Sequence, residues 1–157
     1  FAFYKNSYIG RTFIKPTQEE RESSVHLKLS VLESVVKDKR IVLVDDSIVR
    51  GTTIANLIHM LKEAGAKEVH VRISSPPFLH PCYFGTDVPS NDQLIAASHS
   101  TEEICKMIGA DSLGYMQTDY LEGMAGGLPL CKACFDGNYP MEIPDYTNAE
   151  FADIVKC

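Results

Sequence analysis

Long apolar runs, an excess of basic residues and internal repeats are all missing from this sequence. No stretch reaches about 18 apolar residues, the length that spans a bilayer, and no signal-peptide pattern is visible. We therefore expect a soluble, cytoplasmic protein with no membrane partner. Lysine and arginine number 15 against 21 acidic residues, which gives a net charge of −6. Because no basic stripe with interleaved aromatics is present, we expect no nucleic-acid partner.

Cysteine is present in an odd number, five, and the chain has no secretory features, which argues against a disulfide framework. Cys131 and Cys134 form a C-x-x-C pair, a spacing found in zinc sites, iron–sulfur sites and redox motifs. Cys82 follows a predicted strand and could meet this pair in three dimensions. A fourth metal ligand would then have to come from His80, from Cys157 or from upstream of the chain.

The 157 residues, 45% of them apolar, suffice for one α/β domain that buries about two-thirds of its unfolded surface. The apolar run Ile41–Val44 predicts a buried strand, and the alternation over Val69–Ile73 predicts another. Between them, helical spacing relates four apolar residues: Ile54, Leu57, Ile58 and Leu61. This strand–helix–strand order predicts a βαβ crossover and hence a parallel sheet.

Weaker patterns flank this unit. Residues 101–108 are expected to form a short helix and residues 112–116 a further strand, whereas the chain from Glu122 onward predicts an irregular tail anchored by aromatics. The chain starts at Phe1 within an apparent strand, so we expect it to be part of a longer polypeptide. Residues 5–36, weakly helical from Glu19, are consistent with a mobile flap that closes over phosphate or with a solvated surface loop.

The most informative motif is the nine-residue segment Asp45–Thr53, between the first buried strand and the helix. Open α/β sheets bind ligands at such turns. The free amides of the helix start can take a phosphate, and the acids can take ribose hydroxyls or Mg²⁺. The alternative is an ordinary turn with Asp and Ser as caps. However, two adjacent carboxylates repel each other and are costly to desolvate, so packing alone explains them poorly.

This motif resembles the phosphoribosyl pyrophosphate (PRPP) signature of the type I phosphoribosyltransferases. The resemblance implies their α/β fold, a mostly parallel sheet with flanking helices, here followed by an irregular C-terminal tail. Three further segments make the chain similar to the glutamine PRPP amidotransferase family: Tyr8–Ile14, Ser74–Pro77 and Cys131–Pro140. Together with the signature, they extend the resemblance over nearly the whole chain.

In that family an N-terminal glutaminase domain frees ammonia from glutamine, and a C-terminal domain joins the ammonia to PRPP. The products are 5-phosphoribosylamine and pyrophosphate, in the first step of purine (IMP) synthesis. The resemblance implies that residues 1–121 are part of the phosphoribosyltransferase domain without its first strands, and that residues 122–157 are a C-terminal extension. It also implies a homo-oligomer that purine nucleotides inhibit.

Carried over by residue, the resemblance assigns Asp45 and Asp46 to Mg²⁺ and the ribose hydroxyls. Lys5, Tyr8 and Arg11 fall in the family's flexible loop over PRPP. The expected catalytic residues are Lys5 and Tyr8 of this loop together with the acids Asp45 and Asp46. The loop around the 5-phosphate corresponds to Ser47, Ile48, Val49, Arg50, Gly51, Thr52 and Thr53.

The cysteines match one branch of the family. Cys82, Cys131 and Cys134 correspond to three ligands of the [4Fe–4S] cluster of that branch, and zinc is the rival metal. Cys105 is expected to be an inert buried thiol. No side chain is a convincing nucleophile, and residue 1 is Phe rather than the cysteine that starts the family's glutaminase domain.

Two other functions fit the motif. One is a nucleobase phosphoribosyltransferase, against which the C-x-x-C pair and Cys82 count. The other is a non-catalytic module that senses PRPP or nucleotides, which an assay with ammonia as the nitrogen donor would separate from the enzyme.

Overall fold

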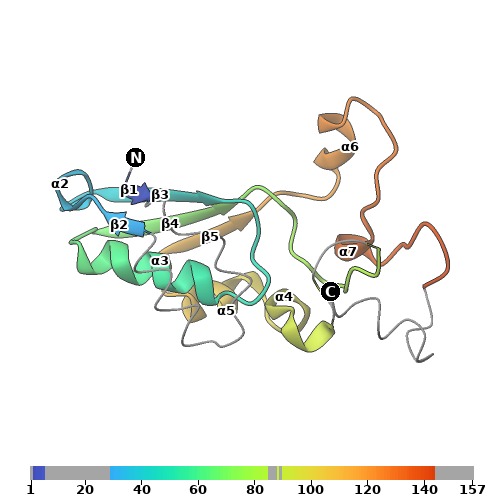
Figure 1. The fold of residues 1–157 in the computed structure, drawn as a ribbon, viewed down its shortest axis with the longest axis horizontal. Coiled ribbons are helices and arrows are strands. Elements are labelled where there is room, and N and C mark those ends of the chain that lie inside the picture. The colour runs from blue at the N-terminus through green and yellow to red at the C-terminus, as the bar shows by residue number, and fades with distance from the viewer. Residues whose placement is uncertain (1, 6–28, 85–87, 89, 144–157) are drawn as a thin grey trace.

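The computed structural model describes residues 2–5, 29–84, 88 and 90–143, and a three-stranded parallel sheet lies at its centre (Figure 1). Strands β3 (Arg40–Asp45), β4 (Glu68–Ile73) and β5 (Ser112–Tyr115) follow one another in that order. Asp45 pairs with Ile73, which in turn pairs with Tyr115. The carboxyl ends of the three strands therefore share one edge, and the predicted parallel sheet is confirmed.

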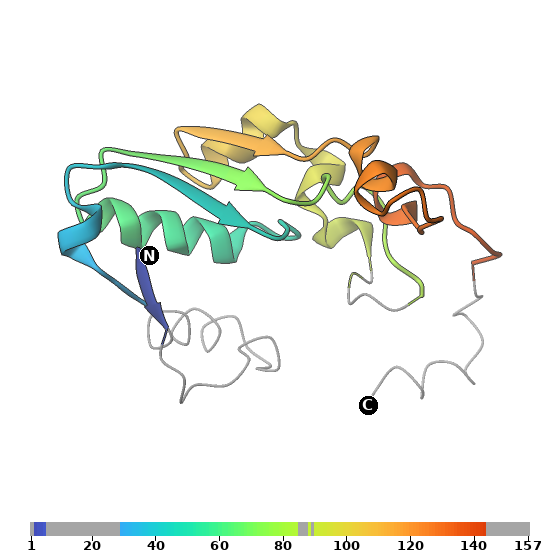
Figure 2. The same cartoon turned by 90° about the horizontal axis from the view of Figure 1, so that it is seen from above.

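Two helices connect these strands and cover one face of the sheet (Figures 1 and 2). Helix α3 (Thr52–Glu63) joins β3 to β4, and α5 (Thr101–Met107) precedes β5. Helix α5 begins with a capping box, in which the Ser100 hydroxyl accepts from the Glu103 N–H and the Glu103 carboxylate accepts from the Ser100 N–H. The expected helices around these positions are confirmed.

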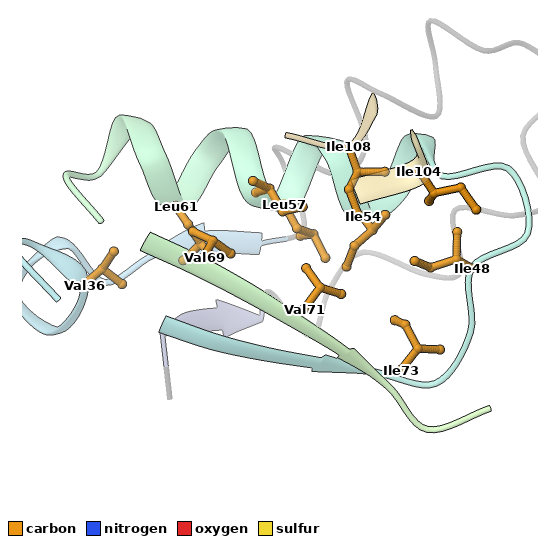
Figure 3. Close-up of a cluster of buried hydrophobic side chains, with 11 residues drawn as sticks. Val36, Ile48, Ile54, Leu57, Leu61, Val69, Val71, Ile73, Ile104 and Ile108 are labelled. Carbon is orange, nitrogen blue, oxygen red and sulfur yellow. The ribbon is translucent and has the colours of Figure 1, made fainter. Parts of the chain in front are cut away.

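The core lies between the sheet and these helices, as Figure 3 shows. The four residues predicted from helical spacing are all buried, and Leu61 is fully enclosed. They pack against Val69, Val71 and Ile73 of β4 and against Ile104 and Ile108 near α5. Burying this many large aliphatic side chains is the main stabilising term available to a domain of this size.

The opposite face of the sheet differs from the prediction of a fully buried strand. Along β3 the side chains alternate, and Val42 and Val44 are 63% and 68% exposed. Within the described part of the chain, no helix covers this face (Figure 1). The apolar run Ile41–Val44 predicted burial on both sides because parallel sheets are usually covered on both faces.

A separate two-stranded antiparallel sheet is formed by β1 (Phe3–Lys5) and β2 (Leu29–Val31), and the short helix α2 (Glu33–Val36) follows. The helix expected to run to Val36 is therefore wrong for residues 29–31. Backbone pairing with β1 replaces helical hydrogen bonds there. The Leu32 N–H continues this pairing by donating to the Ala2 carbonyl at 2.8 Å. The part of this prediction on residues 19–28 lies outside the described residues.

The remaining elements are short. The turn η2 (Asn91–Gln93) and helix α4 (Ile95–Ser98) precede α5, while α6 (Tyr120–Met124) and α7 (Ala133–Asp136) lie beyond the carboxyl edge of the sheet (Figure 1). None of the helices in the described ranges is long and apolar enough to cross a membrane.

The expected aromatic anchors of the C-terminal part are confirmed where they are described. The ring of Phe135 packs against Phe78, with 5.1 Å between centroids, and the ring of Tyr139 lies 5.3 Å from that of Tyr83. The Tyr139 hydroxyl also donates to the Pro81 carbonyl at 2.7 Å. Phe151, another aromatic residue of the expected tail, lies outside the described residues.

The core predicts a sharp contrast between two leucines. Leu61→Ala should lower the free energy of unfolding by about 2–5 kcal/mol, because it leaves a cavity under the sheet. The same change at Leu128, which is 68% exposed, should cost less than about 1 kcal/mol. Urea denaturation followed by circular dichroism measures both, and equal losses would contradict this description of the core.

Candidate functional site

Residues 45–53 link the carboxyl end of β3 to the start of α3 and lie at the edge where parallel sheets bind ligands. Asp45 is the last residue of β3 and Thr52 the first of α3. The structure therefore brings the predicted acids and the predicted phosphate loop to one turn. Each of these residues contributes through different atoms.

Asp45 is a half-buried carboxylate tied to the backbone around it. Its Oδ1 accepts from the Asp46 N–H at 3.0 Å, and its carbonyl accepts from the Ser74 N–H, also at 3.0 Å, just beyond β4. Burial raises the pKa of Asp45; the Asp46 amide lowers it and the Asp46 charge raises it, with a net upward shift. Holding the charged carboxylate in this half-buried position therefore costs free energy. A bound cation or hydroxyl donor would offset that cost.

Asp46 is exposed, and its Oδ1 accepts a long bond, 3.4 Å, from the Ser47 hydroxyl. The two adjacent acids therefore place one hydrogen-bonded, half-buried carboxylate and one exposed carboxylate at the carboxyl edge of the sheet. Carboxylate oxygens are the ligands that Mg²⁺ prefers in proteins. The donor set thus fits the expected magnesium ion, and it fits ribose hydroxyls equally well.

Ile48 anchors the middle of the loop in the core. Its side chain is 2% exposed and packs in the cluster with Ile54, Ile73 and Ile104 (Figure 3). A side chain so placed cannot reach a ligand. Ile48 therefore contributes to the predicted site through its backbone and by holding the turn.

Gly51 caps the N-terminus of α3 in a left-handed conformation, with φ of +83°. A Cβ added there would approach the Cδ1 of Ile95 to 3.1 Å, so both the backbone and the neighbour favour glycine. No side chain caps the first amides of α3, and Thr52 and Thr53 are exposed. Helix amides and hydroxyls in this arrangement are suited to an anion.

Arg50 extends from the loop into solvent, and its guanidinium donates to the side-chain carbonyl of Gln93 in η2. Next to it, the Val49 carbonyl accepts from the Ile95 N–H at 2.9 Å. This support from residues 93 and 95 is absent from the sequence-based predictions. No sequence signal links positions about forty residues apart in one chain, so only the tertiary fold reveals the contact.

The residues expected in the flap are mostly outside what the structure describes. The backbone of Lys5 ends β1, whereas Tyr8 and Arg11 lie outside the described residues. Their expected roles over PRPP stay predictions.

The loop after β4 meets the C-terminal part at the cysteines. The carbonyl of Cys134 in α7 accepts from the amides of Leu79 and His80 at 2.9 and 3.1 Å, which brings Cys82 toward the C-x-x-C pair. Burial first, and then the charges of Cys82 and Cys131, raise the pKa of the Cys134 thiol to about 11. Neighbouring thiols are the donors that zinc and iron–sulfur clusters use.

The described residues of this region nevertheless do not form a complete set of metal ligands. Among the described residues, no group of three His, Cys, Asp or Glu side chains has an arrangement that could hold a metal ion. Cys157, one of the possible fourth ligands, lies outside those residues. Cys105 is separate: it donates to the Ala110 carbonyl, and burial raises its pKa, as expected for an inert thiol.

Comparison with known proteins gives these features a context. Residues 3–74 match the family described as phosphoribosyl transferase domain. The chain is 52% identical to amidophosphoribosyltransferase of Bacillus subtilis over 148 residues, which cover 88% of this chain and 30% of that protein. With the Pyrococcus horikoshii amidophosphoribosyltransferase the identity is 59% over 136 residues, 87% of this chain and 30% of the relative.

The fold is also similar to that of a solved amidotransferase structure. Glutamine PRPP amidotransferase from B. subtilis, complexed with ADP and GMP, superposes with a TM-score of 0.76 at 50% identity, over 92% of this chain and 33% of that one. This confirms the expected type I phosphoribosyltransferase fold. The chain spans about three-tenths of the length of the curated relatives it matches. The chain is therefore homologous to part of the amidophosphoribosyltransferases, with 52% and 59% identity to these two relatives.

Proposed function

We propose that this chain supplies the PRPP site of an amidophosphoribosyltransferase, in which ammonia displaces pyrophosphate from PRPP to give 5-phosphoribosylamine, the first step of purine synthesis. The observation that carries the proposal is the acidic pair Asp45–Asp46 placed beside the uncapped start of α3 at the carboxyl edge of the sheet. Homology to amidophosphoribosyltransferases over nearly nine-tenths of the chain supports it.

PRPP binds with its 5-phosphate on the loop. The amides from Ser47 to Thr53 and the hydroxyls of Thr52 and Thr53 donate to the phosphate oxygens, and the α3 dipole adds a favourable field. Because the chain has a net charge of −6, this local set of donors, with Arg50, must supply the attraction for an anionic ligand.

The ribose lies against the acids. Asp45 and Asp46 accept from the ribose hydroxyls and hold Mg²⁺, which, when bound, stabilises charge on the departing pyrophosphate. The two carboxylates also favour the cationic character that the sugar develops as the bond from C1 to pyrophosphate breaks. Positioning and electrostatics thus account for the catalysis, and the chain needs no covalent nucleophile.

The rest of the reaction uses Lys5 at the end of β1 and parts beyond the described residues. Lys5, Tyr8 and Arg11 close over PRPP, so that water is kept from C1 and ammonia, released from glutamine by a glutaminase domain, attacks there. Purine nucleotides inhibit by occupying the same loop, because a nucleoside monophosphate carries the ribose 5-phosphate of PRPP. The relative solved with ADP and GMP supports this regulation.

The proposal is tested first by calorimetric titration of the complete protein with PRPP, with and without Mg²⁺, and by an assay with ammonia in place of glutamine. Saturable, magnesium-dependent binding together with release of pyrophosphate supports the enzyme. Binding without turnover would instead indicate a sensing module. Turnover with a nucleobase but not with ammonia would identify a nucleobase phosphoribosyltransferase.

Asp45→Asn and Asp46→Asn should each weaken PRPP binding at least about tenfold, because both remove a charge that faces the cation and the ribose. Asp45→Asn should leave the protein as stable as before or more stable. A carboxyl whose pKa is raised by folding loses stability as the pH rises through the interval between its unfolded and folded pKa values, and the amide removes that loss.

Titration and thermal unfolding at neutral pH measure both effects. Asp119→Asn, which changes an exposed acid next to α6, is the matched control and should alter neither. Unchanged affinity in both site variants would remove the basis of the proposed function.

We also propose that Cys82, Cys131 and Cys134 hold a [4Fe–4S] cluster, with its fourth ligand outside the described residues. The convergence of the Cys82 loop and α7 supports this, because Cys134 accepts two backbone bonds from that loop. The cluster would cross-link two segments of the chain that otherwise meet through aromatic pairs and hydrogen bonds, which makes it structural.

Cys134→Ser should therefore remove most of the iron and sulfide and the visible thiolate-to-iron absorbance, and should lower the thermal stability. Cys105→Ser is the control, since this thiol lies in α5 and donates a hydrogen bond to the Ala110 carbonyl just before β5. Metal analysis of anaerobically purified protein measures the effect. Stoichiometric zinc in a colourless protein would overturn the cluster and identify zinc as the metal.

A further inference from the structure

The segment that supports the phosphate loop, residues 91–98, contacts three successive loop residues from one side. The Ile95 amide donates to the Val49 carbonyl at 2.9 Å, and the Gln93 side chain accepts from the Arg50 guanidinium. The Ile95 side chain closes over Gly51, where an added Cβ would lie 3.1 Å from its Cδ1. Two residues of this segment, Gln93 and Ile95, thus make all three contacts with the loop.

This supporting segment is itself anchored. Leu94 is 1% exposed, and Ile95 packs against the core that also holds Ile48. Two backbone hydrogen bonds close the η2 turn. The N–H of Gln93 donates to the Ser90 carbonyl at 3.3 Å, and the N–H of Leu94 donates to the Asn91 carbonyl at 3.0 Å. The backbone at Gln93 is therefore fixed, and its half-buried side chain presents an acceptor to the loop from a defined position.

The chemistry of the pair is informative because Gln93 is neutral. A free arginine side chain samples many rotamers, and ordering it on a ligand costs free energy at the moment of binding. A carboxylate partner would order Arg50 but would also cancel much of its positive charge. An amide carbonyl orders the guanidinium while leaving its charge and its remaining N–H groups available to an anion.

We infer that Gln93 is a positioning residue for the phosphate site: it holds Arg50 in the orientation in which its free N–H groups face a sugar phosphate bound on the loop. The inference rests on the proposed function for its ligand. It assigns to a turn about forty residues downstream of the signature a part in binding the 5-phosphate end of PRPP.

The test compares the wild-type protein with Gln93→Ala, Arg50→Ala and the double variant by calorimetric titration with PRPP. Gln93→Ala should raise the Kd about threefold to tenfold, the range expected when a hydrogen bond to a charged group is lost. The double variant should bind no more weakly than Arg50→Ala, because Gln93 acts through Arg50. A purely structural role would instead make the two losses add.

Asn91→Ala is the matched control, since it removes an exposed amide from the same turn and should leave the Kd within about twofold of wild type. Thermal unfolding of each variant verifies that the fold is intact. Wild-type affinity in Gln93→Ala, or fully additive losses in the double variant, would overturn the inference.

Ribose 5-phosphate is the second probe, because it carries the loop-binding phosphate without the pyrophosphate. If the wild type binds ribose 5-phosphate but not PRPP, the proposed function fails. In that case a higher Kd for ribose 5-phosphate in Gln93→Ala still supports the role of Gln93. If the wild type binds neither, both the proposed function and the inference are wrong.

Discussion

Burial of aliphatic side chains between the parallel sheet and helices α3 and α5 is the interaction on which the rest of the structure depends. Ile48 connects that core to the loop of residues 45–53, because its side chain lies in the core while its neighbours Ser47 and Val49 are only partly buried. A loop held at its centre in this way has little freedom at either end. The acids before Ile48 and the glycine after it are thereby held at one edge of the sheet.

The same core also supports the loop from the other side. Residues 91–98 pack on it through Ile95 and Ala96, so the loop lies between its own helix and a second segment anchored on the same core. Preorganised donors reduce the free energy spent on ordering a site when the ligand arrives. For the phosphate binding proposed for this acidic chain, such local order would replace a general positive field.

The C-terminal part is joined to this core by different contacts. Aromatic pairs between the loop after β4 and α7, a tyrosine hydroxyl on Pro81 and two backbone bonds to Cys134 take the place of a continuous apolar core. Small regions with few buried side chains gain most from a metal or another cross-link. The gathering of three cysteines in this region is in keeping with that need.

The sequence by itself determined the local elements and the chemistry of the turn. Apolar periodicity identified α3, β4 and the region of α5, and the acids and Gly51 predicted a ligand-binding loop at the turn between β3 and α3, because strand alternation, helix spacing and turn residues depend on neighbours in the chain. Only the tertiary structure decided that Gln93 and Ile95 support the loop, that Leu29–Val31 pair with β1, and that Val42 and Val44 lie on a face no described helix covers. These are contacts between residues far apart in sequence, and they depend on how the elements pack rather than on any pattern within one element.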